Sequence, residues 1–413
     1  MSTRDVDVVV VGGGIGGLAA GQALAKKGLA VRVLEMAPEF GEVGAGLQIG
    51  PNCTRILHQW GLLDEVKSLG VLPENIIMRD AMDGSELTRL DLADVEKRYG
   101  FPYMVIHRSD LHATFLRACR REGVELVNNV HVTAYENVED GAQAISAGRV
   151  DEAEVVIAAD GIKSVARGYI VKDDPQNSAY VAYRGAVPIH EVRGNDISER
   201  DVVVYVGPQR HFVQYPLRQG EMFNQVAVFQ SPKALAGEQD WGTPDEMDGA
   251  FVGSCPPVIT GLKHMWRDKW WRMFDRLPIP NWINGRVTLL GDSAHAPLQY
   301  LAQGAIMAME DAWVLSEHVG RQGVKGSVAQ GTSPGIDWDA ALAALNAVRP
   351  VHTKRVLQTG RDWGEFWHHD GAKREWRNSV LRARDVYDYS FVDWLYGPTA
   401  MTPDQIPPMF EKI

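Results

Sequence analysis

The sequence predicts an α/β fold with three parts: a discontinuous Rossmann-like domain, an antiparallel β-sheet domain inserted into it, and a helical C-terminal region. Three observations predict this organisation. The chain begins with a strand, a glycine-rich turn, a helix and a second strand. It becomes rich in alternating β-type segments between residues 180 and 230, and a late buried strand then ends in Gly291-Asp292. The late strand returns the chain to the first domain.

The first element is a strand at residues 8–11, four consecutive valines of the kind found in parallel sheets that are buried on both faces. The glycine motif GGGIGG follows it directly. Gly12 allows the tight turn, Gly14 lets the backbone approach a pyrophosphate, and Gly17 permits close packing of the next helix against the strand. The motif therefore predicts a dinucleotide whose phosphates face the helix N-terminus.

The second strand, residues 30–34, ends in Glu35, about 20 residues beyond the glycines. An acidic side chain at this position normally binds the hydroxyls of a ribose, and its charge disfavours a 2′-phosphate. A glycine motif alone is weak evidence. The ordered combination of strand, glycines, helix, strand and acid is much stronger.

The βα pattern continues through the first domain. A glycine-rich loop at residues 41–46 permits close approach to a flat ligand, and helical patterning follows at 52–60. A helix at 109–122 precedes a strand at 124–127, and a further strand at 154–159 runs into Asp160-Gly161.

Three short strands with alternating patterns predict the inserted domain: residues 201–206, 211–215 and 224–229. A buried strand at 286–290 then leads into Gly291-Asp292, and residues 322–335, rich in Gly, Ser and Thr, predict a mobile loop. The predicted boundaries are 1–175 and 279–345 for the Rossmann-like domain, 176–278 for the inserted sheet and 346–413 for the helical C-terminal region.

Composition limits the class of protein. At 413 residues the chain exceeds one compact core, and 45% hydrophobic with 23% charged residues is ordinary for a globular protein. The net charge of −11 argues against nucleic acid as a partner, because phosphate binding relies on clustered Lys and Arg. We expect a soluble, cytoplasmic protein, since no apolar run is long enough to span a bilayer and the first residues lack a signal-peptide pattern.

The three cysteines, Cys53, Cys119 and Cys255, are far apart, odd in number and without metal-ligand spacing. We expect reduced, buried thiols, which is consistent with the cytoplasm. The adjacent His368 and His369 also have no partner at metal-ligand spacing, so we expect no metal site.

The two glycine signatures together indicate which dinucleotide is bound. The first is compatible with any dinucleotide. The segment Gly291-Asp292-Ser293-Ala294-His295 adds an acidic loop and a helix start where a ribityl-isoalloxazine would lie. The pair therefore predicts FAD rather than NAD, held between distant parts of the chain.

This combination resembles the single-component class A flavoprotein aromatic hydroxylases, through the GxGxxG motif, an Asp-Gly motif in residues 159–167 and the Gly-Asp motif at 291–292. The resemblance covers nearly the whole chain. Within the family the chain is most similar to the 3-hydroxybenzoate 6-hydroxylases, through longer and more specific segments at residues 40–48, 102–114, 182–185 and 297–302.

The resemblance implies a reaction. NADH reduces FAD, the reduced flavin reacts with O₂, and a flavin C4a-hydroperoxide transfers an electrophilic hydroxyl group to an electron-rich phenol. Loss of the phenol proton activates the positions ortho and para to the oxygen. A base is therefore needed near that oxygen, and a neutral imidazole suits this task near pH 7.

His211 matches the base that the family implies, and Tyr215 lies four positions later, on the same face of a strand. Gln299 matches a substrate contact of the family that would bond the phenol oxygen or orient the ring. The alternative is that His211 and Tyr215 only line a hydrogen-bonded strand face. The family match favours the catalytic role.

Tyr103 and Leu47 are predicted substrate contacts in segments that match the family, although a half-buried strand position explains Tyr103 equally well. No arginine is firmly assigned to a substrate carboxylate, and Arg184 is a candidate. Core or dimer packing, rather than a ligand cage, is the favoured interpretation of most of these seven tryptophans: Trp266, Trp270, Trp271, Trp363, Trp367, Trp376 and Trp394.

The resemblance also implies the cofactor contacts. The helix after residue 302 would direct N–H groups at the flavin N1/C2 carbonyl. Here the chain departs from the family, because Ala302 replaces the first glycine of a Gly-Gln-Gly and Ile306 stands near the position of an Asn. The predicted FAD contacts are Gly12, Gly14, Ile15, Gly17, Glu35, Ala45, Gly46, Arg108, Asp160, Asp292, Pro297, Gly304 and Ala305.

The leading hypothesis is an FAD-dependent monooxygenase that uses NADH and O₂ and hydroxylates 3-hydroxybenzoate para to its hydroxyl group, giving 2,5-dihydroxybenzoate. An alternative is a hydroxylase of the same class that acts on salicylate or 6-hydroxynicotinate. A non-catalytic flavin-binding module is less consistent with the sequence, because it needs no base beside a phenol. The preference for NADH rests on the resemblance alone, and the family and the C-terminal tryptophans suggest a homodimer.

Overall fold

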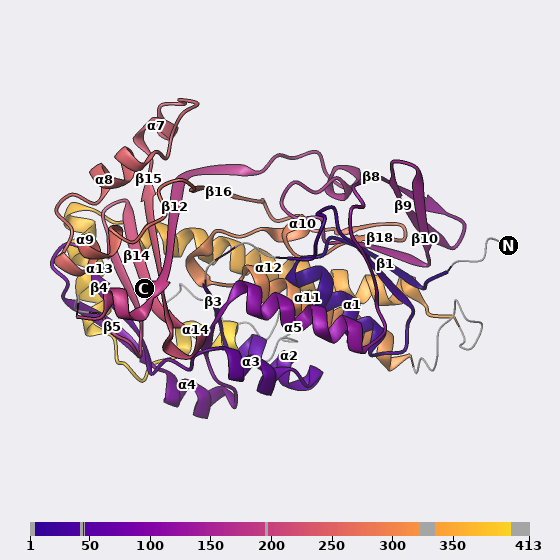
Figure 1. The fold of residues 1–413 in the computed structure, drawn as a ribbon, viewed down its shortest axis with the longest axis horizontal. Coiled ribbons are helices and arrows are strands. Elements are labelled where there is room, and N and C mark those ends of the chain that lie inside the picture. The colour runs from indigo at the N-terminus through magenta and orange to yellow at the C-terminus, as the bar shows by residue number, and fades with distance from the viewer. Residues whose placement is uncertain (1–4, 42–43, 45, 195–196, 323–334, 398–413) are drawn as a thin grey trace.

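The computed structural model describes residues 5–41, 44, 46–194, 197–322 and 335–397. It confirms the predicted fold class: a parallel Rossmann-like sheet, a largely antiparallel sheet inserted into it, and a helical C-terminal region (Figure 1). The loop predicted at 322–335 lies outside the described residues except for its two end positions.

The Rossmann-like sheet is centred on β1 (Val8–Val11), which pairs in parallel with β11 (Val155–Ala158) and β2 (Val31–Leu34). All four valines of β1 are buried, as expected for a strand covered on both faces. β18 (Val287–Leu289) pairs with β11, so the sheet joins the beginning of the chain to a segment beyond the insertion. The edge strands are β7 (Glu125–Val127) and β17 (Ile283–Asn284).

Helices from three regions of the chain pack beside this sheet. α1 (Ile15–Ala25) contacts α5 (Arg108–Arg121) and α11 (Gly304–Arg321). Because α1 is buried along most of its length, it is rich in Ala and Leu on all sides. A small antiparallel sheet precedes β11 and consists of β8 (Val132–Val138), β9 (Gly141–Ser146) and β10 (Arg149–Ala153).

The second large sheet contains the strands predicted for the insertion and confirms all three of them. Its order is β16-β12-β15-β14-β13-β4-β5. Two of its strands come from before residue 176, and β4 pairs in parallel with β13. These two strands lie within residues 1–175, the range predicted for the first part of the Rossmann-like domain. The predicted domain boundaries remain a prediction. The strands are β4 (Asn75–Asp80), β5 (Glu86–Asp91), β12 (Gln176–Pro188), β13 (Val202–Gly207), β14 (Arg210–Leu217), β15 (Met222–Gln230) and β16 (Trp271–Asp275).

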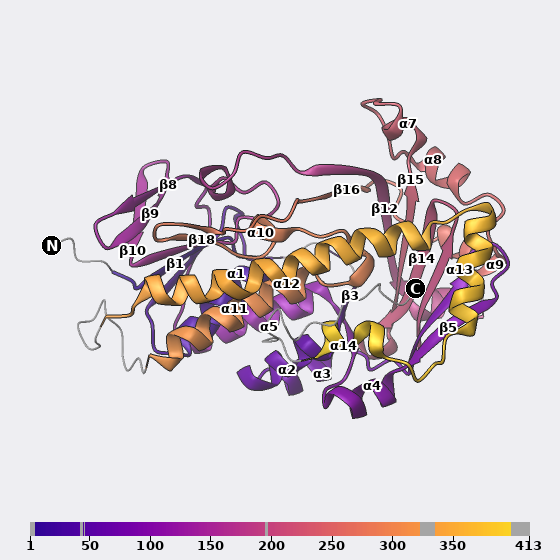
Figure 2. The ribbon, with the colours of Figure 1, turned by 180° about the vertical axis from the view of Figure 1, so that it is seen from behind.

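The C-terminal helices connect the two large sheets. α12 (Trp338–Trp367) has 30 residues and runs from the Rossmann-like sheet to the second sheet (Figure 2). α13 (Gly371–Ala383) then packs against β5. The buried carboxylate of Asp80, at the end of β4, accepts hydrogen bonds from Arg374 and Asn378 and so ties α13 to the second sheet.

The remaining elements are mostly short. No helix of the described residues is long and apolar enough to cross a membrane. These elements are β3 (Gly46–Ile49), β6 (Met104–His107), α2 (Pro51–Trp60), α3 (Leu63–Leu69), α4 (Leu92–Tyr99), α6 (Ile189–Val192), α7 (Pro232–Leu235), α8 (Pro244–Ala250), α9 (Pro256–Leu262), α10 (Asp292–His295), α14 (Ser390–Tyr396), and the 3₁₀ turns η1 (Ala166–Tyr169), η2 (Arg218–Gly220) and η3 (Gln299–Leu301).

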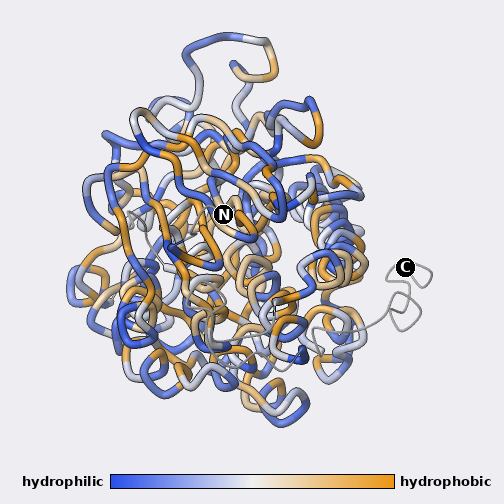
Figure 3. The backbone as a smooth tube through the Cα atoms, turned by 90° about the vertical axis from the view of Figure 1, so that its right-hand side faces the viewer, coloured by the Kyte–Doolittle hydropathy of each residue, from blue (hydrophilic) through white to orange (hydrophobic). Residues whose placement is uncertain are grey.

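Hydrophobic and hydrophilic stretches alternate along the elements, as one-sided burial requires (Figure 3). One apolar cluster lies around α1, and another lies between the second sheet and the C-terminal helices. The predicted packing role fits Trp367 and Trp394, which are buried, whereas Trp376 is half exposed. The three cysteines are free and buried, as predicted.

Candidate active site

The turn from β1 to α1 needs glycine for steric reasons. Gly12 has φ +110°, and a Cβ on it would lie 2.2 Å from the carbonyl oxygen of Ala159. A Cβ on Gly17 would lie 1.9 Å from the carbonyl oxygen of Gly12. The turn, the helix and β11 therefore approach one another as closely as the sequence motif predicts.

The N-terminus of α1 suits an anion. Gly14 is its N-cap, and its first turn has neither a side-chain cap nor an acidic residue. The first N–H groups of a helix lack partners within the helix, and the helix dipole adds positive potential there. Ile15 begins the helix and is buried, so it would reach a pyrophosphate through its backbone.

Glu35 lies where the sequence predicts a ribose contact, directly after β2. The backbone N–H of Gly13 donates to its Oε2 at 2.7 Å, and the N–H of Ala37 donates to its Oε1 at 2.8 Å. The carboxylate is therefore held beside the glycine turn, with lone pairs left on both oxygens.

Asp160 has a structural role and one free atom. Its Oδ2 accepts hydrogen bonds from the Tyr135 hydroxyl and the backbone N–H groups of Val165 and Ala166. Its Oδ1 is buried without a partner among the described residues. A buried carboxylate oxygen without a partner is costly, so it marks a place for a polar ligand group or a water beside the cradle.

The second signature forms a turn between β18 and α10. Gly291 has φ +68°, and its N–H donates to the buried Oδ2 of Asp311 at 3.0 Å. Asp292 begins α10 and is exposed, whereas His295 is buried and contacts the same Asp311 oxygen at 2.6 Å. His295 thus has a structural contact, as its sequence context favours, and the exposed position of Asp292 at the start of α10 is compatible with the predicted ribityl contact.

The loop after α10 leads to the N-terminus of α11. Ala302 has φ +53°, and α11 begins at Gly304 without a side-chain cap or a first-turn acid. A Cβ on Gly304 would lie 3.5 Å from Pro297, so the two flanks of the loop are in contact, with Ala305 one position further into the helix. This helix start fits the predicted flavin carbonyl.

Arg108 begins α5 and packs against the glycine loop. A Cβ on Gly44 would lie 2.9 Å from Arg108 Cδ. Ala45, also a predicted FAD contact, lies outside the described residues. The close-packed glycine turn, the two uncapped helix starts and the carboxylates of Glu35 and Asp292 supply the kinds of hydrogen-bonding groups that FAD requires.

The second sheet presents His211 and Tyr215 on one face, as predicted. Cross-strand partners point to the same side of a sheet. His211 faces Val228, Tyr215 faces Asn224, and Arg184 lies on the same face through its register with Val226, which pairs with Val213.

The glycine loop and the sheet meet at Tyr215. A Cβ on Gly46 would lie 2.4 Å from the Tyr215 ring, and the N–H of Gly46 donates to Asn224 Oδ1 at 3.0 Å. A predicted cofactor contact and a predicted catalytic residue are therefore neighbours.

Gln299 reaches the other end of this face, as predicted. Its Nε2 lies 3.4 Å from Nε2 of His211. Tyr300 and Trp367 enclose the imidazole, with ring centroids 5.5 Å and 5.2 Å away. Burial lowers the pKa of His211 to about 3, so the imidazole is neutral at pH 7.

The two predicted substrate contacts are placed differently. The Tyr103 hydroxyl donates to Gln48 at 2.7 Å, and its ring lies against Tyr396. Leu47 packs against the apolar cluster around α1. Both remain predictions as substrate contacts.

Arg184 lies half-buried on the face of the second sheet that carries His211 and Tyr215. Its guanidinium stands 5.4 Å from the ring centroid of Trp271. Burial lowers the pKa of Arg184, and the titratable groups of the described residues that act on it are Tyr215 and Arg108 rather than a carboxylate. This arginine is suited to an acidic ligand.

Sequence reasoning missed two polar residues of this site. Asn224 interrupts an alternating apolar stripe in β15, which is a weak local signal. His368, at 2.8 Å from His211, lies 157 residues away in the chain, and no local pattern predicts that contact.

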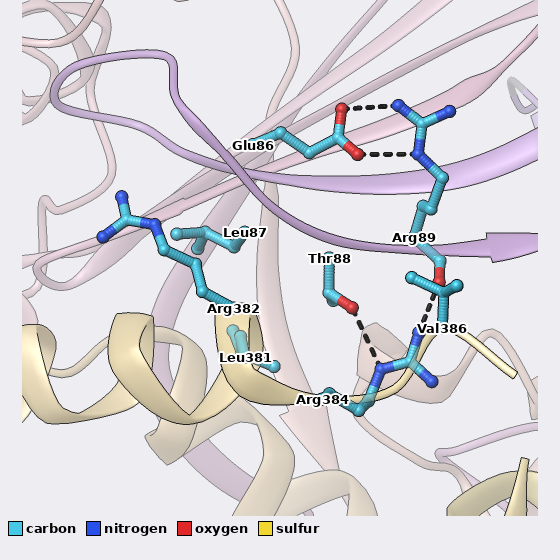
Figure 4. Close-up of a pocket in the computed structure, with 8 residues that line it drawn as sticks. All are labelled: Glu86, Leu87, Thr88, Arg89, Leu381, Arg382, Arg384 and Val386. Atoms are coloured by element: carbon cyan, nitrogen blue, oxygen red, sulfur yellow. Dashed lines mark hydrogen bonds and ion pairs between the residues drawn. The ribbon is translucent and has the colours of Figure 1, made fainter. Parts of the chain in front are cut away.

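Two surface pockets formed by described residues lie beside β5, at one edge of the second sheet. One, of about 250 Å³, lies between β5 and the end of α13, and its Arg89 and Arg384 are already bonded to Glu86 and Thr88 (Figure 4). The other, of about 410 Å³, includes Tyr103 in its lining. Neither is lined by His211, Tyr215 or Gln299.

The chain is similar to known proteins along most of its length. The family described as "FAD binding domain" matches residues 5–322. The 3-hydroxybenzoate 6-hydroxylase of Polaromonas naphthalenivorans (strain CJ2) is 36% identical over 95% of this chain and 96% of its own length. The 3-amino-4-hydroxybenzoate 2-monooxygenase of Streptomyces cremeus is 35% identical over 98% of both chains.

Solved structures share the fold. HpxO of Klebsiella pneumoniae, complexed with FAD and uric acid, has a TM-score of 0.78 and 26% identity, covering 92% of this chain and 93% of its own. A salicylate hydroxylase substrate complex has a TM-score of 0.76 and 25% identity, covering 96% of both chains.

Proposed function

Because the chain belongs to the FAD-dependent aromatic hydroxylases, we propose that it converts 3-hydroxybenzoate to 2,5-dihydroxybenzoate (gentisate), with NADH as electron donor and O₂ as oxygen source. The substrate and the position of attack are those in the name of the Polaromonas relative. The hydroxyl group enters para to the existing one, where a phenolate is most electron-rich.

When bound, FAD supplies the redox chemistry: it takes a hydride from the nicotinamide and activates O₂ for transfer of one oxygen atom to the arene. The chain's own groups then have defined tasks. The N-terminus of α1 holds the pyrophosphate, Glu35 the ribose, Asp292 a ribityl hydroxyl, and the N-terminus of α11 the flavin carbonyl.

The contact between Gln299 and His211 is the observation that carries the proposal. At 3.4 Å it is at the outer limit of a hydrogen bond, so a phenol oxygen can replace it at little cost. The oxygen would then lie between an amide that donates to it and an imidazole nitrogen that accepts its proton. His211 removes the proton at Nε2, and the resulting phenolate is activated for attack at the para carbon.

The buried position of His211 makes this proton transfer depend on the substrate. Burial disfavours the imidazolium, so the free site keeps His211 neutral. A phenolate formed beside it supplies the opposite charge that favours the imidazolium. The proton therefore moves as part of an ion pair.

Arg184 is the proposed partner of the substrate carboxylate. It lies on the same face as His211 and Tyr215, and no carboxylate of the described residues is paired with it. A guanidinium binds a carboxylate through two parallel hydrogen bonds, which would fix the ring against the face of the sheet.

The test is a substrate panel with the purified FAD-loaded protein. NADH consumption is followed with 3-hydroxybenzoate, salicylate, 6-hydroxynicotinate and benzoate, and the products are identified by chromatography. We expect gentisate from 3-hydroxybenzoate and faster consumption with NADH than with NADPH. NADH consumption that yields only hydrogen peroxide with every phenol contradicts the proposal, and turnover of salicylate or 6-hydroxynicotinate alone reassigns the substrate.

The base is tested by His211→Ala. We expect hydroxylation to slow by roughly 10²–10⁴-fold, the usual contribution of a general base, while flavin reduction by NADH changes little. Exposed His190→Ala is the matched control and should behave as the wild type. Equal losses in the two steps would show that His211 only supports the fold.

Two properties of the whole protein are also proposals. The half-exposed Trp376 and the exposed Tyr387 at the C-terminal end support a homodimer, which light scattering tests against the monomer mass of 45.7 kDa. The three free cysteines support a reducing compartment such as the cytoplasm.

A further inference from the structure

We propose that His368, directly after α12, is a positioning residue for His211: its Nε2 accepts the Nδ1–H of His211 and so keeps the Nε2 lone pair of His211 directed at the phenol. The inference rests on the proposed function. It makes the helical C-terminal region part of the active site.

The geometry of the pair is that of two imidazoles joined by one hydrogen bond. Nδ1 of His211 lies 2.8 Å from Nε2 of His368, the ring centroids are 5.1 Å apart, and the planes differ by 18°. The rings therefore meet edge to edge. Both side chains are buried, so water does not compete for this bond.

Which histidine donates in this hydrogen bond follows from the group that faces the other ring nitrogen of His211. A neutral imidazole carries a proton on one nitrogen and a lone pair on the other. The Gln299 amide nitrogen faces Nε2 of His211, so Nε2 is the acceptor and Nδ1 carries the proton. His368 must then accept at its Nε2 and keep its own proton on Nδ1.

His368 is itself firmly held. The ring of Tyr180 stacks on it with centroids 4.7 Å apart and planes 17° apart, and Tyr300 contacts its face edge-on. Its backbone carbonyl accepts the N–H of Gln209, two residues before His211. The backbone contact thus fixes His368 to the same hairpin that carries the base.

Burial, together with the neighbouring His211 and Arg377, keeps His368 neutral. The titratable groups that face it are His211, Tyr180, Tyr300 and Arg377. Burial, His211 and Arg377 all lower the pKa of His368. When the phenol O–H bond breaks and the N–H bond forms at Nε2 of His211, the positive charge therefore stays on His211. His368 remains the acceptor of a charge-assisted hydrogen bond.

Two substitutions separate positioning from other roles. His368→Gln places an amide oxygen near the position of Nε2 and still accepts the Nδ1–H, whereas His368→Phe keeps the ring stack and loses the acceptor. The neighbouring His369→Phe is the matched control, because His369 contacts Phe366 and Trp376 rather than His211.

The readout is the ionisation of bound 3-hydroxybenzoate in the FAD-loaded enzyme, followed by its phenolate absorption against pH, with the yield of product per NADH. With His368→Phe we expect the apparent pKa of the bound phenol to rise by about one unit, a tenfold loss of ionisation. Product yield should fall while flavin reduction is unchanged. His368→Gln should restore both values, and His369→Phe should match the wild type.

Three results would overturn the inference. If His368→Phe ionises the phenol like the wild type, the contact has no role. If Gln fails as fully as Phe, a titratable imidazole is required and His368 relays the proton instead. If ¹⁵N NMR of the wild-type protein shows the His211 proton on Nε2, the proposed direction is wrong even where a variant fails to fold.

The same measurements keep this inference apart from the proposed function. A wild-type enzyme that hydroxylates none of the phenols contradicts the function, while the NMR result still tests the histidine pair. A wild-type enzyme that makes gentisate, together with unchanged phenol ionisation in His368→Phe, contradicts the inference alone.

Discussion

At position 302 an alanine occupies backbone space that favours glycine. Ala302 has φ +53° and ψ +33° and ends η3 just before α11. The same position departs from the Gly-Gln-Gly of the family. The fold therefore keeps the left-handed turn that leads into α11, the proposed flavin-binding helix, even though a Cβ there is unfavourable.

We predict that Ala302→Gly stabilises the protein. Removing the unfavourable left-handed conformation of alanine should raise the free energy of unfolding by about 1 kcal/mol. The greater conformational freedom of glycine in the unfolded chain offsets part of this gain, so the net increase should be roughly 0.5 kcal/mol. Denaturant unfolding of the FAD-loaded protein measures the change. Ala343→Gly, on an exposed face inside α12, should lower the stability instead.

Individual residues differ in how well the sequence predicts their place in the candidate site. The family resemblance predicts His211 and Gln299, strand spacing places Tyr215 on the face of His211, and the structure brings Gln299 to His211. The sequence around His368 has no metal-ligand pattern and predicts no role for it. Its partner lies in another element, and sequence spacing carries no information about such a contact.

At the scale of elements, a buried ionic network joins α11 to α12. Arg349 donates to Glu310 at 2.8 Å and to Asp311 at 2.7 Å, and Asp311 also holds His295 and the N–H of Gly291. The network thus links the C-terminal region to the turn that carries Asp292. Its four side chains are almost fully buried.

The charges of this network set a pH dependence. Burial alone would raise the pKa of Glu310 and Asp311, but Arg349 and the histidines lower both to about 2. Ordinary values in the unfolded chain are near 4, so the network contributes its full stability above about pH 4.5. That contribution is lost as the pH falls towards 2.

We predict that Arg349→Met costs about 3–5 kcal/mol at pH 7, because it leaves two buried carboxylates without their cation. The difference from the wild type should shrink as the pH falls from 4.5 towards 2. Urea unfolding at a series of pH values measures both effects. Arg267→Met, which removes an exposed pair with Asp248, should cost less than about 1 kcal/mol, and an equal loss would mean that burial is unimportant.

At the scale of the whole molecule, the FAD cradle and the substrate face are assembled from distant segments. β1, β2 and α1 supply one side of the proposed cradle and β18, α10 and α11 the other, and the second sheet contacts the start of β3 through Asn224. Binding of FAD should therefore stabilise the entire fold, since it contacts parts that the chain order separates.

We predict that Gly17→Ala abolishes FAD retention, because its Cβ would lie 1.9 Å from the Gly12 carbonyl oxygen. The flavin absorbance per chain should approach zero. In the wild type, FAD at about 100 times its dissociation constant should add roughly 2.7 kcal/mol, and this gain should vanish in the variant. Gly249→Ala, in an exposed helix with open space around it, should retain FAD, and retention by Gly17→Ala would contradict the predicted cradle.

The sequence by itself determined the local elements and the chemistry of the cradle. A turn that requires glycine, an alternating strand pattern and an acidic residue after β2 can each be recognised from residues that are neighbours in the sequence. The structure agrees with the predicted strands around β1, β13, β14 and β15 to within one or two residues. The resemblance added a candidate base, His211, and a candidate amide contact, Gln299, because the chain is similar to the family along nearly its whole length.

Only the tertiary structure decided which distant groups share a site. In the structure β4 and β5 belong to the second sheet, α12 extends from one large sheet to the other, and His368 contacts His211. Such contacts arise when apolar faces from distant parts of the chain pack together. Hydrophobic periodicity and secondary-structure propensity describe only neighbouring residues, so they do not predict these contacts. The proposed base can therefore be predicted from the sequence, whereas the residue proposed to orient it is found only in the fold.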